Sequence, residues 1–402
     1  MIAFTEAYHL TLQAIQSLPV ERVALLDAIG RIVGQDLLSP IDSPSAEVSF
    51  KDGYALRAAD VRTASPENPV RLRLVGSIAA GGAWQRSEHS SETTHPGDAI
   101  RLEEAIRILS GAPLPPGADA ILAEEFTRLE PGAVIALNHA EPGRNILPRG
   151  ADVQAGQLLA QTGQRLMPTT IGLLAAAGYS TVPVIRRPRV AILATGDEVI
   201  APGQPLAPGK LYASNLCTLA AWCLHYGFEV ETFVAPDDSS AIRLSLSSCL
   251  EGFDAVLTSG GAWKGERDLV ANILDALGWH KIYHRVRMGP GKAVGFGVYR
   301  DKPVFILPGG PPSNHMAFLQ LALPGLHRLA GYANPGLPLL PATLNSDISG
   351  QVDWTQFVHG RLALESGRLR FTPLRLTSRL LEMSHTEALA RIPEGVAGIP
   401  AG

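Results

Sequence analysis

Apolar and polar positions follow the periods of short helices and strands, and the pattern changes character several times along the chain. Residues 4–38 carry apolar side chains at helical spacing, which predicts a helix-rich start. Residues 44–140 contain short apolar runs separated by Pro and Gly, which predict an inserted β-rich domain. Helical spacing returns around residues 167–177, before Gly178. We therefore expect residues 1–43 and 141–180 to form one discontinuous helical and linker domain.

A βα rhythm follows over residues 181–331. The strand-like runs RVAILAT, EVETFVA, DAVLTSG and PVFILPG alternate with helical segments that begin near Ser214, Ser239, Asp268 and Ser313. The strands are rich in Val, Ile and Leu without alternation, which indicates burial on both faces of a parallel sheet. This pattern predicts a doubly wound α/β domain, and residues 332–402, which are poor in helical signals, predict a C-terminal β domain. The expected fold class is multidomain α/β and β.

Composition and charge narrow the function classes. The chain has 402 residues, a formal net charge of −4 and 3 cysteines without a C-x-x-C pair, so we expect no nucleic-acid partner and no disulfide or zinc framework. It shows no leader pattern and no apolar stretch of about 18 residues, so we expect no membrane partner and a cytoplasmic location. Walker A, G-x-G-x-x-G and G-x-S-x-G motifs are absent, which argues against P-loop NTPases, dinucleotide dehydrogenases and serine hydrolases.

The loops that follow the predicted strands carry the candidate chemistry, because parallel sheets bind ligands at the carboxyl ends of their strands. Two of these loops, TSGGAWKGERD and LPGGPPSN, can cradle phosphate groups, although either alone could be an ordinary tight turn. The carboxylates of Glu198, Asp237 and Asp268 could hold Mg²⁺ on a phosphate. Asp238 could instead cap a helix. Lys292 is a candidate phosphate contact, and the alternative is a solvated surface lysine.

The order of motifs resembles that of the molybdopterin molybdenumtransferases, a family also found as the E domain of gephyrin. The resemblance covers nearly the whole chain and rests on the motifs DGYA, GAPLPPGADAILAEE, GRNILPRGADVQAGQLL, RRPRVAILATGDEV, SN, TSGG, GPGKAVGFG and LPGGPPS. It implies an enzyme that inserts molybdate into adenylylated molybdopterin, with release of AMP and formation of molybdenum cofactor. It also implies an elongated homodimer of four-domain subunits with an active cleft between the α/β domain of one subunit and the second domain of the other. A pterin adenylyltransferase would act upstream.

Carried over onto this chain, the resemblance implies two sets of site residues and Mg²⁺ as cofactor. The residues expected at the reaction centre are Asp52, Glu198, Asp237, Asp268 and Lys292, with Glu198, Asp237 and Asp268 as Mg²⁺ ligands. The residues expected to bind the pterin and its phosphates are Ser110, Gly196, Asp197, Ser214, Asn215, Ser259, Gly260, Gly261, Pro308, Gly309 and Ser313.

Several loop residues depart from the family pattern, and they leave alternatives open. Lys51 replaces Met in MDGYA, Trp263 and Lys264 interrupt GGVSVG, Gly289 replaces Lys in KPGKP, and Gly310 replaces Asn in LPGNPVS. We hypothesise that Lys51 or Lys264 restores the charge lost at Gly289. The alternatives to the transferase are a divergent molybdopterin-binding paralogue that acts as a carrier or regulator, and a pterin adenylyltransferase. The sequence does not choose between molybdate and tungstate.

Overall fold

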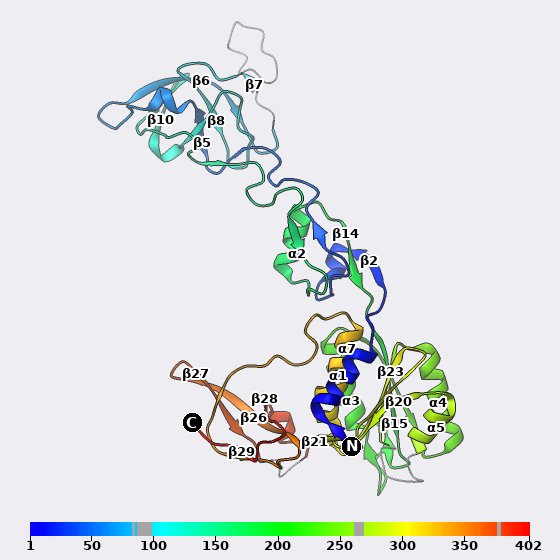
Figure 1. Ribbon diagram of the computed structural model, residues 1–402. Helices are drawn as coiled ribbons and strands as arrows, with labels where there is room; N and C mark the ends of the chain where they lie inside the picture. Colours follow the sequence, from blue (N-terminus) through cyan, green and yellow to red (C-terminus); the bar gives the residue numbers. More distant parts are fainter. Residues whose placement is uncertain (83–84, 87–98, 261–268, 376–378) are drawn as a thin grey trace. The chain divides into compact units, whose positions relative to one another are not determined.

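The chain forms two compact units of helices and sheets (Figure 1). The structure, a computed structural model, describes residues 1–82, 85–86, 99–260, 269–375 and 379–402. Unit 1 comprises Met1–Gln35, Thr162–Met167 and Val182–Gly402, and unit 2 comprises Asp36–Gln161 and Pro168–Thr181. The expected fold class, multidomain α/β and β, is confirmed, whereas the four-part division of the chain stays a prediction. In the described residues, no helix combines the length and the apolar character needed to cross a membrane.

The central element of unit 1 is a six-stranded sheet in the order β18-β15-β19-β23-β22-β20. Its first four strands in this order are parallel to one another, and β22 pairs antiparallel with both β23 and β20. The bounds are β15 Arg189–Thr195, β18 Glu229–Ala235, β19 Ala255–Ser259, β20 His280–His284, β22 Gly295–Tyr299 and β23 Lys302–Leu307. The four predicted strands therefore form, and helices on both faces explain the continuous apolar character of β15, β19 and β23. The expected burial on both faces is wrong for β18, because it is an edge strand in which only Ala235 is buried.

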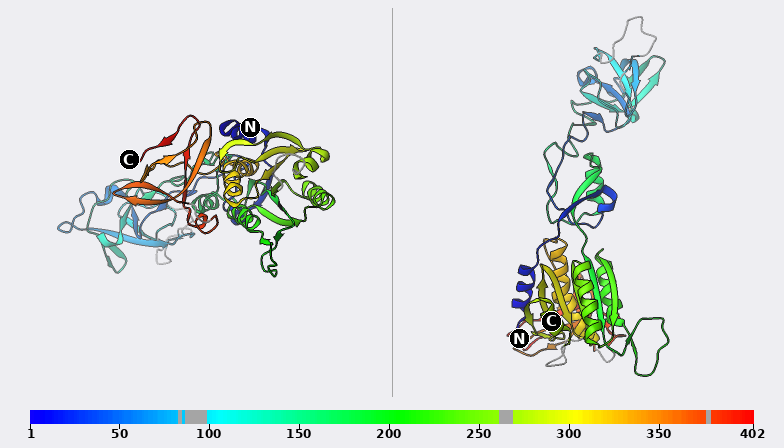
Figure 2. Two further views of the ribbon diagram at one scale, coloured as in Figure 1. Left: turned by 90° about the horizontal axis from the view of Figure 1, so that it is seen from below. Right: turned by 90° about the vertical axis from the view of Figure 1, so that its right-hand side faces the viewer.

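Two helical layers cover this sheet (Figure 2). One layer packs on the face that contains Ile192 and Leu257, and the other on the face that contains Leu193 and Val256. The first layer consists of α1 Phe4–Ala14, α3 Ser214–His225, α6 Pro311–Ala317 and α7 Leu323–Leu329, with a short π-helical stretch, Phe318–Ala322, before α7. The second layer consists of α4 Ser239–Gly252 and α5 Leu269–Leu277. Successive strand residues face opposite layers, as the period of a β-strand requires.

The sequence-based prediction fails after α1. Residues Val20–Ala24 form strand β2, which pairs with β14, Thr181–Ile185, although helical spacing was expected to continue to residue 38. Pro19 cannot continue a helix from Ile15, and the β-branched Val20 and Val23 favour extended backbone. A 3₁₀ turn at Leu25–Ala28 is the only other helical turn among described residues 15–38.

Unit 1 also contains a second sheet that includes the C-terminal residues. Its order is β1-β21-β26-β27-β24, and β28 pairs with β26. The pairing of β21 with β26 joins Met288 to Thr355, so a strand of the α/β segment lies within the C-terminal sheet. The bounds are β1 Ile2–Ala3, β21 Val286–Gly289, β24 Thr343–Leu344, β26 Thr355–Glu365, β27 Arg368–Pro373 and β28 Ala388–Ile392. A small pair, β25 Ile348–Ser349 and β29 Gly398–Ile399, completes this segment.

Unit 2 is built on a sheet with the order β10-β11-β6-β8-β5-β9, and β7 pairs with β6. Alternate residues of β5 enter different cores, because Tyr54 and Leu56 pack with Leu72 whereas Ala55 packs with Ile106. The bounds are β5 Gly53–Leu56, β6 Val70–Ile78, β7 Gln85–Arg86, β8 Glu104–Ile108, β9 Ala120–Ala123, β10 Thr127–Glu130 and β11 Ala133–Ala136. Two short pairs, β3 Leu37–Leu38 with β13 Leu158–Ala160 and β4 Val48–Ser49 with β12 Ile146–Leu147, and helix α2 Pro168–Ala176 complete the unit.

Candidate functional site

The carboxyl edge of the parallel sheet in unit 1 gathers most of the predicted site residues. From β15 the chain moves to β18 on one side, and it then returns to β19 on the other side of β15. A doubly wound sheet opens a crevice at such a change of direction. The loops that begin at Gly196, Gly260 and Pro308 leave β15, β19 and β23 at this edge. The carboxyl edge at β15 and β19 is therefore the candidate active site.

Two asparagines hold Ser259 at the end of β19. The Nδ2 atom of Asn215 lies 3.3 Å from Ser259 Oγ and 2.8 Å from the carbonyl oxygen of Gly309. The Nδ2 atom of Asn314 lies 3.1 Å from Ser259 Oγ and 2.9 Å from the carbonyl oxygen of Pro308. An amide NH₂ group only donates, so Ser259 Oγ accepts from both and keeps its own proton for a third partner. We call Asn215, Asn314 and Ser259 the serine clamp.

The serine clamp joins predicted residues with one that sequence analysis missed. Asn215, Ser259, Pro308 and Gly309 were predicted, and the clamp brings them together. Asn314 was not predicted, although it is only 1% exposed. The available signal was an Asn directly after LPGGPPS, at the start of a helix whose other early residues are Pro and Ser.

The glycines of this edge permit a close approach of neighbouring strand ends. Gly260 has φ +102°, and a Cβ atom there would lie 2.8 Å from the carbonyl oxygen of Thr195. A Cβ atom on Gly196, whose φ is +144°, would lie 2.7 Å from a carboxylate oxygen of Glu198. Both positions therefore require glycine. The backbone N–H of Gly260 donates to the carbonyl oxygen of Leu307 at 3.2 Å, so this glycine ties the end of β19 to the end of β23.

Three carboxylates lie after β15 and β18. The backbone N–H of Asp237 donates to Asp197 Oδ1 at 3.1 Å, and the side chains of Asp197, Glu198 and Asp237 are exposed. Partial desolvation of the Asp237 carboxyl raises its pKa, and the charges of Asp197 and Glu198 raise that pKa further. Lys210 Nζ donates to the carbonyl oxygen of Asp197.

Two of these carboxylates, Glu198 and Asp237, belong to the predicted Mg²⁺ site. Asp268, its third expected ligand, lies outside the described residues, as do Gly261, Trp263 and Lys264. Within the described part of the chain, no three His, Cys, Asp or Glu side chains have an arrangement that could hold a metal ion. The donor chemistry of Glu198 and Asp237 suits a hard cation, since both offer only carboxylate oxygens.

The other candidate residues of unit 1 lie at helix starts and in the loop before β22. Asp238 caps α4, because its Oδ1 accepts from the backbone N–H of Ala241 at 2.8 Å. The side chain of Lys292 is exposed. Its neighbour Gly291 packs closely on α6, where a Cβ atom would lie 3.3 Å from the carbonyl oxygen of Ser313. The Lys292 loop is therefore adjacent to the end of the LPGGPPS motif. Ser214, at the start of α3, is half-buried.

Asp52 and Ser110 meet in unit 2. The backbone N–H of Ser110 donates to Asp52 Oδ1 at 2.6 Å, and the carbonyl oxygen of Asp52 accepts from the backbone N–H of Glu124 at 3.1 Å. Gly53 is required beside Asp52, because a Cβ atom there would lie 2.2 Å from the carbonyl oxygen of Leu122. The two predicted residues thus form one structured turn, and one oxygen of the Asp52 carboxylate, Oδ2, has no hydrogen bond to another described residue.

Comparisons with known proteins agree over both units. Residues 2–178 match the family described as MoeA N-terminal region (domain I and II), and residues 191–328 match the family described as probable molybdopterin binding domain. The chain is 32% identical over 388 residues to molybdopterin molybdenumtransferase 2 of Mycobacterium tuberculosis, covering 94% of this chain and 92% of that protein. It is 33% identical over 390 residues to the molybdopterin molybdenumtransferase of a Nostoc species, covering 95% of this chain and 87% of that protein.

A solved structure extends this similarity to the fold. The crystal structure of the molybdopterin biosynthesis moeA protein from Pyrococcus horikoshii matches with a TM-score of 0.82 and 28% sequence identity. The match covers 100% of this chain and 98% of that chain.

Proposed function

Because the chain belongs to the molybdopterin molybdenumtransferase family, we propose that its carboxyl-edge site joins molybdate to adenylylated molybdopterin and releases AMP. The chain is a transferase of molybdenum cofactor biosynthesis, and insertion of molybdenum into molybdopterin is the reaction of its family. The observation that carries the assignment to this edge is the serine clamp, which presents one hydroxyl proton beside two glycine loops.

Both substrates are anions, so the site must supply hydrogen-bond donors and positive charge. The hydroxyl of Ser259 donates to a phosphate or molybdate oxygen, and the exposed backbone at Gly309 contributes a further N–H donor. Lys292, on the adjacent loop, supplies a positive charge. Ser214 and Ser313, at the starts of two helices, are placed to add hydroxyl donors.

The carboxylates at the same edge fit a divalent cation rather than an anion. Glu198 and Asp237, with Asp268 from the adjoining loop, would hold Mg²⁺, and the cation would offset the charges of Asp197 and Glu198, which add to the effect of burial in raising the pKa of Asp237. Bound Mg²⁺ would neutralise charge on the phosphoanhydride. Asp197 orients the loop after β18, since it accepts from the backbone N–H of Asp237.

The proposal includes partners and location. Asp52 and Ser110 would complete the site from the second subunit of a homodimer, and an upstream pterin adenylyltransferase would supply the activated pterin. A cytoplasmic location is also part of the proposal.

The test is AMP release from adenylylated molybdopterin and Mg²⁺, with and without molybdate or tungstate. We expect AMP only in the presence of the oxyanion, and we expect Ser259→Ala to lose at least tenfold in rate while Ser240→Ala, on the exposed surface of α4, keeps the rate of the unmodified chain. Tight pterin binding without AMP would instead support the carrier or regulator. Pyrophosphate release from ATP would support the adenylyltransferase.

A further inference from the structure

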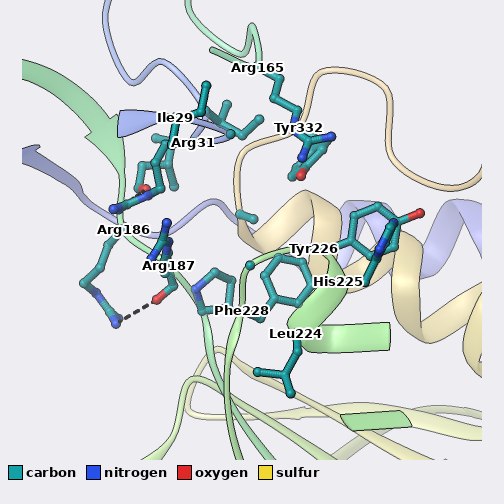
Figure 3. A pocket seen from close by; sticks show the side chains of 16 residues that line it. Ile29, Arg31, Arg165, Arg186, Arg187, Leu224, His225, Tyr226, Phe228 and Tyr332 are labelled. Carbon is teal, nitrogen blue, oxygen red and sulfur yellow. Dashed lines mark hydrogen bonds between the residues drawn. The ribbon is translucent and has the colours of Figure 1, made fainter. Parts of the chain in front are cut away.

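The amino edge of the same sheet contains a cavity that the proposed reaction does not use. Its volume is about 140 Å³ (Figure 3). It is lined by residues 185–188 before β15, by residues 224–228 at the end of α3, by Ala330 and Tyr332 after α7, and by residues 29–32 and Arg165. All of its lining residues belong to unit 1. The seven-residue strand β15 separates it from the carboxyl edge, a distance of roughly 20 Å. The cavity is therefore distinct from the candidate active site.

The cavity wall carries positive charge without a matching carboxylate. Four arginines line it, and none of the described lining residues is acidic. Two of the four arginines pair with carboxylates that do not line the cavity. Arg31 pairs with Glu21, and Arg186 forms hydrogen bonds of 2.9 and 2.6 Å to Asp254. The other two, Arg165 and Arg187, are exposed and have no side-chain hydrogen bond or ion pair with any described residue. An anion in the cavity would face two uncompensated guanidinium groups.

A tyrosine adds an unsatisfied donor to this wall. Tyr332 lines the cavity, and its buried hydroxyl oxygen has no hydrogen-bond partner in the described residues. Burial raises the pKa of Tyr332, although the charge of Arg165 lowers it, so the hydroxyl keeps its proton at neutral pH. In Figure 3 the Arg165 side chain points toward the ring of Tyr332. A buried unpaired hydroxyl is costly, and an oxyanion would satisfy it.

The wall is held in place by close packing. The ring of Tyr332 stacks on that of His327, with centroids 4.4 Å apart, and the ring of Tyr226 meets His327 edge-on at 4.4 Å. A Cβ atom on Gly331 would lie 2.6 Å from the side chain of Ile185, so the turn after α7 lies directly against the segment before β15. The aromatic part of the wall is therefore fixed before an anion arrives, which lowers the entropic cost of binding.

We propose that this cavity binds a doubly charged tetrahedral oxyanion, either free or as the phosphoryl end of a small organic molecule. Arg165, Arg187 and the hydroxyl of Tyr332 donate to its oxygens, and Tyr226 provides an aromatic wall for an attached ring. The volume accommodates a tetrahedral oxyanion, because a cavity of about 150 Å³ holds one benzene ring, which is a larger group.

The experiment is calorimetric titration of the full chain with inorganic phosphate and, separately, with phenyl phosphate. We expect one site to weaken about tenfold or more in Arg165→Gln and in Arg187→Gln, because each loses a charge-assisted hydrogen bond. Arg243→Gln is the matched control, since Arg243 is an exposed arginine on α4 with no acidic partner in the described residues. Circular dichroism of each variant tests that it folds. Tyr332→Phe should weaken the same site without a change of charge.

The titrations also separate this site from the carboxyl edge, which binds anions as well. Ser259→Ala should leave the Arg165-dependent site unchanged, so failure of the proposed transferase and failure of this site give different results. Tighter binding of phenyl phosphate than of phosphate, reduced in Tyr226→Leu, would identify the phosphoryl end of an organic molecule as the ligand. Equal affinities would identify a free oxyanion. Absence of an Arg165-dependent site for both probes, or an equal loss in Arg243→Gln, would overturn the proposal.

Discussion

Replacement of Asn314 by Ala removes one arm of the serine clamp, and its cost follows from the geometry. Asn314 is 1% exposed and donates to Ser259 Oγ at 3.1 Å and to the carbonyl oxygen of Pro308 at 2.9 Å. Each neutral hydrogen bond contributes about 1 kcal/mol, and a buried carbonyl left without its partner costs about 1–3 kcal/mol. Ser259 Oγ retains its bond from Asn215, so the loss falls mainly on Pro308. We expect the free energy of unfolding to fall by about 2–4 kcal/mol.

The matched control is Asn345→Ala. The Nδ2 atom of Asn345 also donates to a hydroxyl, Thr372 Oγ1 at 2.8 Å, but this bond is exposed to solvent. Water replaces an exposed partner, so we expect a loss below about 1 kcal/mol. Urea denaturation followed by circular dichroism measures both variants under the same conditions.

Activity provides the second readout. In Asn314→Ala the loop at Pro308 is no longer tied to Ser259, so we expect the rate of AMP release to fall more than pterin binding does. Asn215→Ala should show the same pattern, and the double variant should lose more than the sum of the two single losses, because each single variant leaves Ser259 Oγ with one donor and the double variant leaves it with none. Equal stability losses in Asn314→Ala and Asn345→Ala, with unchanged activity, would refute the clamp.

Three further predictions follow from the packing. Gly260→Ala should abolish AMP release, because its Cβ atom would meet the carbonyl oxygen of Thr195 at 2.8 Å. Gly310→Ala is the control: no atom lies within 4 Å of the Cβ position at Gly310, so this variant should keep both activity and stability in parallel assays. Burial lowers the pKa of His327 from 6.5 to about 4. Between these pH values the unfolded chain therefore binds a proton that the folded chain does not. The free energy of unfolding, measured in urea, should fall as the pH drops through this range, and it should fall less steeply in His327→Gln. Asp254→Asn leaves the guanidinium of Arg186 unpaired and should cost about 2 kcal/mol in urea denaturation, and a loss independent of salt and pH would contradict this account.

Local pattern determined much of the fold. The four strands of the α/β segment could be predicted because continuous apolar runs between Gly and Pro leave few alternatives to buried parallel strands, and Asp238 could be identified as a cap because capping needs only neighbouring residues. The prediction of helix at Val20–Ala24 was wrong because the structure of this segment depends on a distant partner. That segment becomes a strand through its pairing with β14, about 160 residues away, and no local period reports such a partner.

The residues of the candidate site were likewise predictable only in part. The sequence by itself determined that glycine loops, carboxylates and Ser259 follow strands, since strand ends are visible in the apolar pattern. Only the tertiary structure decided that Asn215 and Asn314 converge on one oxygen, and that Arg165 and Arg187 share a cavity with Tyr332. The physical reason is that a hydrogen bond or a cavity depends on the positions of groups far apart in the chain, whereas periodicity reports only the surroundings that one segment needs.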